Sequence, residues 1–267
     1  MFASSLLTAG VVSCTFRKSP IRDVVRLAKQ AKLQAIEWGA DGHVPPGDIK
    51  QARTAKEMSR DAGLTITAYD CGYRLGEADG NGGGNGGGNG GKTPFKLILD
   101  TAMELAAPTV RVWAGAKGSQ PHDPVYRNQV IEESRRIASQ AAAAGVSVAY
   151  EFAAGSLADA NESALQLLRS VNHPNVRTFW QPPAGQTAEY ALAGLQGLLS
   201  FVTDVHVQYV SPGTERQPLD GGAEGWRQYI RILRGTGRPH ALLLEYVLGD
   251  SPEQFQKDAA TLREWLE

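Results

Sequence analysis

The sequence lacks an excess of charge, a cysteine framework and long apolar runs. Its 27 Lys and Arg residues and 28 Asp and Glu residues leave a net charge of -1, so no basic field is available to hold nucleic acid. Cys14 and Cys71 are the two cysteines, and their separation matches neither a metal motif nor a disulfide framework. No apolar run approaches the roughly 20 residues that a membrane helix needs. We therefore expect a cytoplasmic protein that binds neither nucleic acid nor a membrane.

What the sequence does contain is a regular alternation of two patterns. Short apolar, β-branched runs predict eight strands, at residues 9–15, 35–38, 65–69, 109–113, 147–152, 177–180, 204–207 and 241–246. Between them, apolar residues recur every three or four positions and predict eight helices, at 21–31, 49–62, 94–105, 124–143, 161–170, 187–199, 222–233 and 252–266.

Local signals agree with these boundaries. Ser19-Pro20 and Ser251-Pro252 are typical of helix starts, and Gly63 and Gly145 follow helix ends. Strands that alternate with helices pair in parallel, and eight strands are the number that closes a (β/α)8 TIM barrel. The sequence therefore predicts one such barrel as a single domain over residues 1–267.

Residues 81–91 read NGGGNGGGNGG and can bury no apolar surface. The strand–helix alternation continues in phase on both sides of this tract, so it does not separate two domains. We interpret it as a flexible Gly/Asn-rich insertion in the loop after the third strand. An inert insertion and a mobile flap over an active site are both compatible with this composition.

Polar residues lie at the C-terminal ends of the last four predicted strands. These ends form the barrel face that carries the active site in such folds. Glu151 and Glu245 each end an apolar run, where a carboxylate has no packing role. Gln181 ends the sixth strand and His206 lies in the seventh. Two carboxylates, an imidazole and an amide oxygen that meet on the axis suit one divalent metal ion. Mn²⁺ or Mg²⁺ fits these ligands best, and Zn²⁺ or Co²⁺ is compatible with them.

Further residues at or just after the strand ends are candidates for substrate binding. The indoles among them suit the apolar face of a sugar and equally suit packing at the barrel mouth, and His43 equally suits a loop cap. Arg111 alternates with two valines, and we interpret it as the partner of a carboxylate inside the barrel. The candidates are Glu37, Trp38, His43, Tyr69, Tyr73, Arg74 and Trp113.

Several short segments, in this order and at these strand ends, resemble the xylose isomerase-like barrels over nearly the whole chain. They are EWGADGHVPPGD, RLGE, VRVWAG, HVQ, PLDGG and LLLEYV, and the sugar phosphate isomerase/epimerase group is the most similar. The resemblance implies one divalent metal ion held by Glu151, Gln181, His206 and Glu245. It also implies that the two Glu residues act as acid and base on either side of a substrate carbon.

The chain departs from the pattern of this family at three positions. The sixth-strand ligand is Gln181 where the family usually has Asp, and Ala184 stands where a His is usual. The substrate-binding Arg after the seventh strand is replaced by Pro212, with Arg216 nearby as a stand-in. These departures imply a metal site with one negative charge fewer and a substrate other than the commonest one in the family.

The sequence therefore predicts a metal-dependent isomerase or epimerase of a sugar, sugar phosphate or similar polyol. A Glu pair would move a proton at a carbon next to a carbonyl. A dehydratase or lyase on the same scaffold shares that step, and a sugar-binding barrel with a degenerate metal site needs no catalysis. A related zinc-dependent apurinic endonuclease is disfavoured by five histidines and the charge of -1. The oligomeric state stays open, and a homo-oligomer is compatible with the sequence.

Overall fold

A computed structural model describes residues 6–76, 93–210 and 215–267 of the chain. The glycine-rich tract at 81–91 lies outside the described residues, so its predicted role as a loop insertion stays a prediction. No helix in the described ranges is long and apolar enough to cross a membrane.

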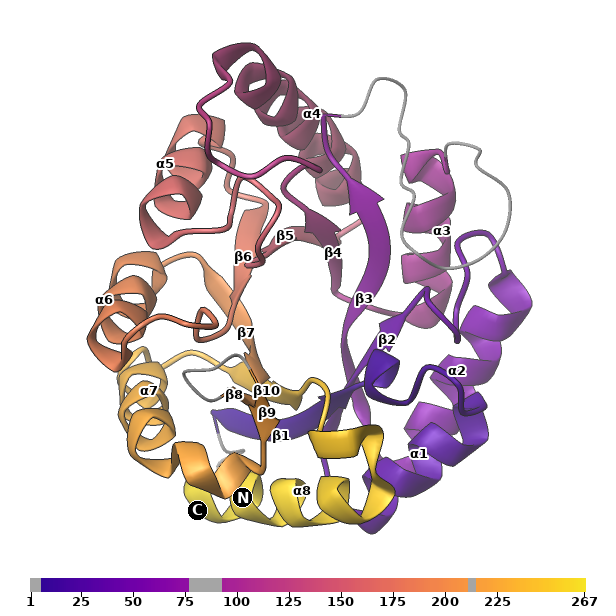
Figure 1. Cartoon of the computed structure of the whole chain (residues 1–267). Coiled ribbons are helices and arrows are strands. Elements are labelled where there is room, and N and C mark those ends of the chain that lie inside the picture. The colour runs from indigo at the N-terminus through magenta and orange to yellow at the C-terminus, as the bar shows by residue number, and fades with distance from the viewer. Residues whose placement is uncertain (1–5, 77–92, 211–214) are drawn as a thin grey trace.

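Eight parallel strands close into a barrel, as the alternation predicted (Figure 1). Their order around the ring is β1-β10-β7-β6-β5-β4-β3-β2, and β1 pairs with β10 through Leu7 and His240. The strands are β1 (Leu7–Val12), β2 (Ala35–Gly39), β3 (Thr65–Arg74), β4 (Thr109–Trp113), β5 (Ser147–Glu151), β6 (Val176–Trp180), β7 (Val202–Val207) and β10 (His240–Leu244).

A ring of helices surrounds the barrel (Figure 1). The helices are α1 (Ile21–Gln30), α2 (Ile49–Ala62), α3 (Phe95–Leu105), α4 (Pro124–Ala143), α5 (Asn161–Val171), α6 (Ala188–Leu198), α7 (Ala223–Gly235) and α8 (Pro252–Leu266). Three short 3-10 turns join them to the strands: η1 (Ser13–Phe16), η2 (Leu219–Gly222) and η3 (Leu248–Asp250).

The predicted signals are confirmed at the start of α8 and at the end of α2, and α1 begins at Ile21 as predicted but without Ser19 as its cap. Ser251 accepts a hydrogen bond from the backbone N–H of Gln254 and caps α8, and Gly63 ends α2 in the left-handed conformation. Before α1, however, Pro20 occupies the N-cap position and no side chain caps the helix. Ser19 lies one residue too early to reach the free N–H groups of the first turn.

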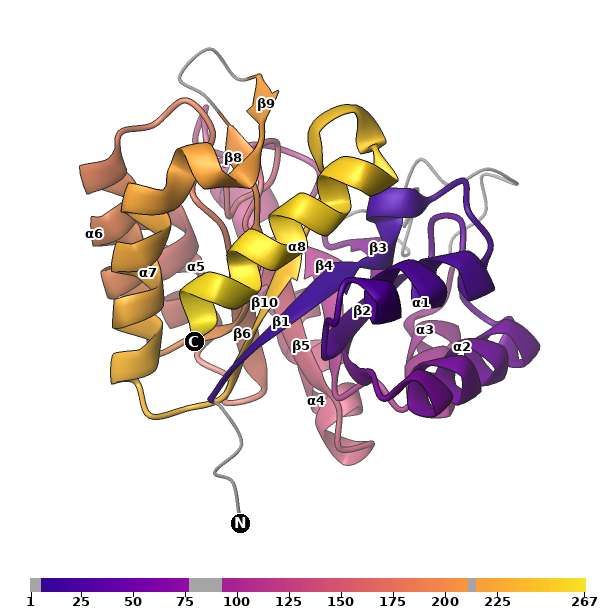
Figure 2. The same cartoon turned by 90° about the horizontal axis from the view of Figure 1, so that it is seen from below.

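Three strands end two or more residues away from the predicted position. The chain turns into η1 directly after Val12, so β1 is shorter at its C-terminal end than the predicted 9–15. Strand β3 continues to Arg74 instead of ending at Tyr69, and β10 ends before Glu245. A small antiparallel hairpin of β8 (Tyr209–Val210) and β9 (Arg216–Gln217) was not predicted, and it lies at the C-terminal end of the barrel (Figure 2).

Two apolar layers hold the barrel together. The larger one lies between the strands and the helices and contains the big aromatic side chains. The smaller one fills the barrel interior below the strand ends with mostly small residues, and its members are Val12, Cys14, Ala35, Ala68, Ala149, Phe179, Ala241 and Leu243. The fit is tight at Gly10, where an added Cβ would lie 2.6 Å from both Ala35 O and Leu243 Cδ2. This packed floor leaves the upper interior to polar residues.

Candidate active site at the barrel axis

Alternate residues of each strand face the barrel axis or the surrounding helices, because successive side chains point to opposite sides of a strand. Glu37 on β2 and Asp70 on β3 face the axis, where both pair with the guanidinium of Arg111 on β4. Their neighbours Trp38 and Tyr69 belong to the apolar layer beneath the helices. The position of a residue in this alternation therefore decides whether it reaches the site.

Arg111 is almost completely buried among carboxylates, with a side chain that is 3% exposed. Its Nε donates to Glu37 Oε1 at 2.5 Å, and its Nη2 pairs with Asp70 Oδ2 at 2.9 Å. Its Nη1 donates to Glu151 Oε2, while Glu245 Oε1 lies 3.9 Å from Nη2. The predicted pairing of Arg111 with a carboxylate inside the barrel is confirmed, and the guanidinium faces several acids at once.

His206 on β7 also lies between carboxylates. Its Nε2 is 3.0 Å from Glu37 Oε2, and its Nδ1 is 3.1 Å from Glu245 Oε2 and 3.6 Å from Glu151 Oε1. Burial alone would lower the pKa of His206, but Glu245 and Glu151 outweigh it and raise that pKa well above its usual value. We call the residues around this point the inner ion cluster: Glu37, Asp70, Arg111, Glu151, His206 and Glu245.

Three members of the inner ion cluster fit one divalent metal ion. Glu151, His206 and Glu245 offer ligand atoms that all lie within 4.8 Å of one another. The cluster sets four carboxylates against one guanidinium, and a divalent cation would offset the excess negative charge. Because Glu37 engages Nε2 of His206, Nδ1 faces the other carboxylates, as in metal sites where an outer carboxylate orients the imidazole. Oxygen ligands with one imidazole suit Mg²⁺ or Mn²⁺.

The predicted fourth ligand, Gln181, reaches the same place with its amide nitrogen. Its Nε2 donates to Glu151 Oε1 at 3.2 Å and to the carbonyl of Phe152 at 2.8 Å. Its Oε1 accepts a hydrogen bond from Gln208 Nε2 at 2.8 Å. In this arrangement Gln181 positions Glu151, and its oxygen would face the cluster only if the amide were reversed.

Two neighbouring groups differ in ionisation. Burial would raise the pKa of Glu151, but Arg111 and His206 outweigh it and lower that pKa to about 2, so the carboxylate is ionised at neutral pH. The thiol of Cys14 lies 4.0 Å from Glu245 Oε1, and burial together with Glu245 raises its pKa. Cys14 is therefore a neutral neighbour of the site and not a thiolate nucleophile.

The structure does not bring two of the predicted substrate-binding aromatics to the cluster. Trp38 is fully buried and donates from Nε1 to Ser59 Oγ of α2 at 3.0 Å. Tyr69 is fully buried too, and its hydroxyl donates to the carbonyl of Val44 at 2.7 Å. Both follow from alternation, since their strand neighbours face the axis.

Two further candidates also make structural contacts away from the axis. His43 is buried, its Nε2 lies 3.0 Å from the carbonyl of Ser19, and its ring packs edge-on against Trp38. The hydroxyl of Tyr73 donates to Glu133 Oε1 of α4 at 2.6 Å. Of the predicted set, these contacts leave three residues at the open end of the barrel, namely Arg74, Trp113 and Arg216.

Those three residues and Tyr246 form two stacked pairs at the barrel mouth. The guanidinium of Arg74 lies over the ring of Trp113, 4.1 Å from its centroid. That of Arg216 lies 4.7 Å from the ring centroid of Tyr246, the residue after Glu245. Cationic and aromatic groups therefore border the inner ion cluster on two sides.

Two residues of this network were not predicted from the sequence. Asp70 pairs with Arg111, and Gln208 holds the amide of Gln181. Asp70 was missed because β3 was expected to end at Tyr69, although alternation from Tyr69 would have turned Asp70 inward. Alternation also predicts Gln208, because a residue two positions after His206 faces the same side of the strand.

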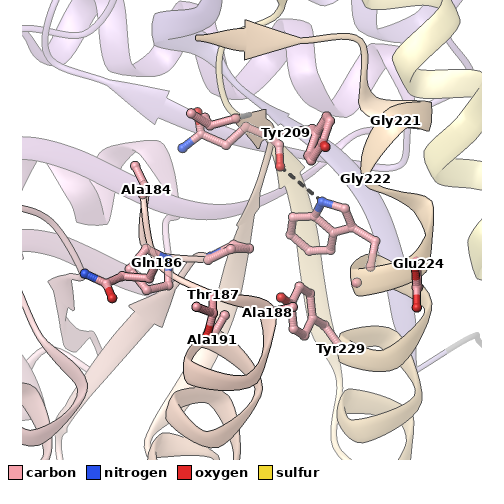
Figure 3. Close-up of a pocket in the computed structure, with 17 residues that line it drawn as sticks. Ala184, Gln186, Thr187, Ala188, Ala191, Tyr209, Gly221, Gly222, Glu224 and Tyr229 are labelled. Atoms are coloured by element: carbon pink, nitrogen blue, oxygen red, sulfur yellow. Dashed lines mark hydrogen bonds between the residues drawn. The ribbon is translucent and has the colours of Figure 1, made fainter. Parts of the chain in front are cut away.

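A cavity of about 300 Å³ adjoins the network on the β6–β7 side (Figure 3). It lies between the loop after β6, strand β8 and the start of α7, and Gln208 forms part of its wall. The carbonyl of Gln208 accepts a hydrogen bond from Trp226 Nε1 at 3.1 Å. A Cβ on either Gly221 or Gly222 would lie 2.7 Å from the ring of Tyr209, so this wall requires glycine.

The profile of the family described as xylose isomerase-like TIM barrel matches residues 25–265. The chain belongs to this family, as the resemblance of its strand-end segments indicated. No curated protein matches the chain.

Solved structures with the same fold share little sequence with this chain. The probable 3-DHS dehydratase AsbF from Bacillus anthracis is 18% identical, with a TM-score of 0.77 over 96% of this chain and 98% of that one. A xylose isomerase-like TIM barrel protein from Mycobacterium smegmatis in complex with magnesium is 15% identical, with a TM-score of 0.72 over 100% and 98%. D-Psicose 3-epimerase from Clostridium cellulolyticum with D-tagatose is 14% identical, with a TM-score of 0.68 over 97% and 99%.

Proposed function

We propose that the protein is a sugar or sugar phosphate isomerase or epimerase that uses a divalent metal ion, Glu151 and Glu245. The observation that carries this proposal is the approach of both carboxylates to one imidazole nitrogen. Glu245 Oε2 and Glu151 Oε1 lie 3.1 Å and 3.6 Å from Nδ1 of His206. Two buried acids that converge at a barrel mouth can reach one substrate carbon from different sides.

The chain's own residues would move one proton. One of the two Glu carboxylates takes a proton from the carbon next to the substrate carbonyl, and the other returns a proton. Return to the opposite face of the same carbon inverts it, whereas return to the neighbouring carbon, with passage of the hydroxyl proton to the former carbonyl oxygen, moves the carbonyl. A bound metal ion would stabilise the negative charge that develops on the substrate oxygens. Arg111 and Glu37 would hold Glu151 and His206 in place throughout.

The relatives support this chemistry without deciding it. D-Psicose 3-epimerase with D-tagatose and the magnesium complex have this fold, and so does a probable dehydratase. A dehydratase or lyase would begin with the same proton removal and then expel a hydroxyl group. The free, buried thiols of Cys14 and Cys71 are compatible with a reducing compartment, which supports a cytoplasmic enzyme.

The proposal is tested by measuring deuterium uptake from D₂O at the substrate carbon. The protein, loaded with Mn²⁺, is incubated in D₂O with a panel of ketoses, aldoses and their phosphates. We expect deuterium at the carbon next to the carbonyl of the substrate. Glu151→Gln and Glu245→Gln should each lower turnover by about 10²–10⁴-fold, because each removes a proton-transfer group. Glu264→Gln, on the exposed side of α8, is the matched control and should keep full turnover.

Three outcomes separate the alternatives. Loss of water from the substrate, with both Glu residues required, would replace the isomerase by a dehydratase or lyase. Binding of a sugar without exchange or turnover would leave a binding protein. Near-normal turnover in both Gln variants would remove the acid–base assignment.

A further inference from the structure

Arg74 at the end of β3 is a cation whose hydrogen-bond donors have no acceptor among residues 6–76, 93–210 and 215–267. Its guanidinium stacks 4.1 Å from the ring centroid of Trp113, and the side chain is half-buried. Within the described ranges, it forms no ion pair or hydrogen bond with any residue. Stacking fixes the plane of a guanidinium while its N–H groups at the edge stay available.

The other arginines at this end of the barrel are engaged. Arg111 is enclosed by carboxylates of the inner ion cluster. Arg17 pairs with Asp41 at 2.8 Å and donates to Tyr246. Arg216 lies 3.9 Å from Asp250. Arg74 therefore differs from these three because no acid in the described part of the chain pairs with it.

The strand register places Arg74 at a useful distance from the acid pair. Arg74 is the register partner of Trp113 on β4, and Trp113 is the register partner of Glu151 on β5. Neighbouring strands lie about 4.8 Å apart, so about 10 Å separate the backbones of Arg74 and Glu151. Strands β3, β4 and β5 follow one another around the ring (Figure 1). A small sugar substrate is long enough to bridge a gap of this size.

We infer that Arg74, held by Trp113, binds an anionic oxygen group of the substrate, a carboxylate or a phosphate. The inference rests on the proposed function and narrows its substrate class to acidic sugars. A guanidinium edge matches the two oxygens of either group. An acidic group held by Arg74 leaves the other end of the substrate towards Glu151, so Arg74 also sets the orientation of the substrate.

Binding measurements on matched ligands test this inference. Titration calorimetry of the Mn²⁺-loaded protein compares D-fructose with D-gluconate and D-fructose 6-phosphate. We expect at least one acidic ligand to bind about 10–100-fold more tightly than D-fructose, as a charge-assisted pair provides. The tighter of the two acids identifies carboxylate or phosphate as the preferred group.

Variants assign the preference to Arg74. Arg74→Gln should abolish the difference between acidic and neutral ligands, and Arg74→Lys should retain part of it because the charge stays while the two-pronged geometry is lost. Arg231→Gln, at an exposed position of α7, removes the same charge and should change nothing. Acid that binds through the Mn²⁺ alone would persist in Arg74→Gln, and this outcome would overturn the inference.

Two other results also overturn it: equal affinity for acidic and neutral ligands in the unaltered protein, and no binding of either acid at millimolar concentration. Urea unfolding of Arg74→Gln checks that the barrel stays folded. The proposed function fails separately, because deuterium exchange does not depend on the charge of the ligand. Exchange with neutral sugars alone would keep the isomerase and remove the Arg74 site. Arg74-dependent binding without exchange would do the reverse.

Discussion

The two faces of the same barrel strands carry different kinds of residue. On β2, Glu37 faces the axis and is bound by Arg111 and His206, while Trp38 faces α2. On β3, Asp70 faces the axis and Tyr69 faces outward. Adjacent residues at a strand end can therefore have unrelated roles: one lies in the ion cluster and the other packs against the helices.

The two faces are also stabilised in different ways. Outward aromatics such as Trp38 and Trp180 are fully buried, and the removal of their apolar surface from water favours folding. Inward acids lose hydration when buried, and this loss is offset only while Arg111 and His206 remain paired with them. The four tests below examine this difference, and the test with the largest expected effect comes first.

Arg111→Met should break the inner face most severely. It leaves buried carboxylates without their guanidinium, and loss of one partner of a buried pair costs about 3–5 kcal/mol of unfolding free energy. Urea unfolding should also show that this loss shrinks at low pH, where the acids take up protons. Arg53→Met is the control, because the exposed pair of Arg53 with Glu104 should contribute at most about 1 kcal/mol. Equal losses in both variants would contradict the comparison.

Substitutions of the adjacent pair Glu37 and Trp38 should separate metal binding from stability. Glu37→Gln weakens the carboxylate that orients His206, and changes of this kind lower metal affinity by about 10–100-fold. Trp38→Phe removes the hydrogen bond to Ser59 and part of the buried ring, so it should cost about 1–3 kcal/mol while Mn²⁺ affinity stays the same. Calorimetry with Mn²⁺ and urea unfolding measure the two quantities. A loss of Mn²⁺ affinity in Trp38→Phe would show that the faces are coupled.

Gln181→Asp should strengthen metal binding on the axis-facing side of the strands, because it adds a negative charge there. A carboxylate oxygen is a stronger ligand for a hard cation than an amide, so Mn²⁺ binding should tighten by about tenfold in calorimetry. Gln186→Glu adds the same charge at an exposed position of the loop after β6, outside the proposed ligand set, and serves as the control. Unchanged or weaker binding by Gln181→Asp would mean that Gln181 acts only through its hydrogen bond to Glu151.

Asp258 on α8 should give the smallest effect, a change in how stability depends on pH. It is a buried acid without an ion pair among the residues that the structure describes. Burial raises its pKa above the usual value, so the folded protein keeps a proton that the unfolded chain releases near pH 3.9. Stability should therefore fall as pH rises from there through the raised pKa, by at most about 1.4 kcal/mol per pH unit. Asp258→Asn keeps an oxygen to accept the hydrogen bond from Leu219 N–H and should remove this slope. Parallel urea-unfolding profiles for both proteins would contradict the assignment.

Much of the fold could be predicted from the sequence, because all eight strand–helix units carry strong periodic signals. Glu151, His206 and Glu245 could be placed near one another because parallel strands deliver their ends to one face of a barrel. The pairing of Arg111 with acids could be predicted as well, since a charge between two valines of a buried strand needs a partner.

The rest depended on lengths and directions that periodicity does not encode. The predicted third strand ended at Tyr69 and left Asp70 outside it. The observed strand β3 runs to Arg74, and Asp70 lies inside the barrel. Trp38 and Tyr69 were expected at the mouth because the prediction considered only their distance along the chain from a strand end. The β8–β9 hairpin has strands of two residues, too short to show any alternation.

The pairing of β1 with β10 has a consequence for how the chain folds during synthesis. Leu7 and His240 are register partners although almost the whole chain lies between them. Synthesis from the N-terminus delivers β10 last, together with Glu245, so the emerging chain holds Glu37 and Arg111 long before the ring can close. Contacts so distant in sequence slow folding, because chain entropy must be lost before they form. A ribosome-bound chain that ends before residue 240 lacks the strand that pairs with both β1 and β7, so it can close neither the ring nor the ion cluster.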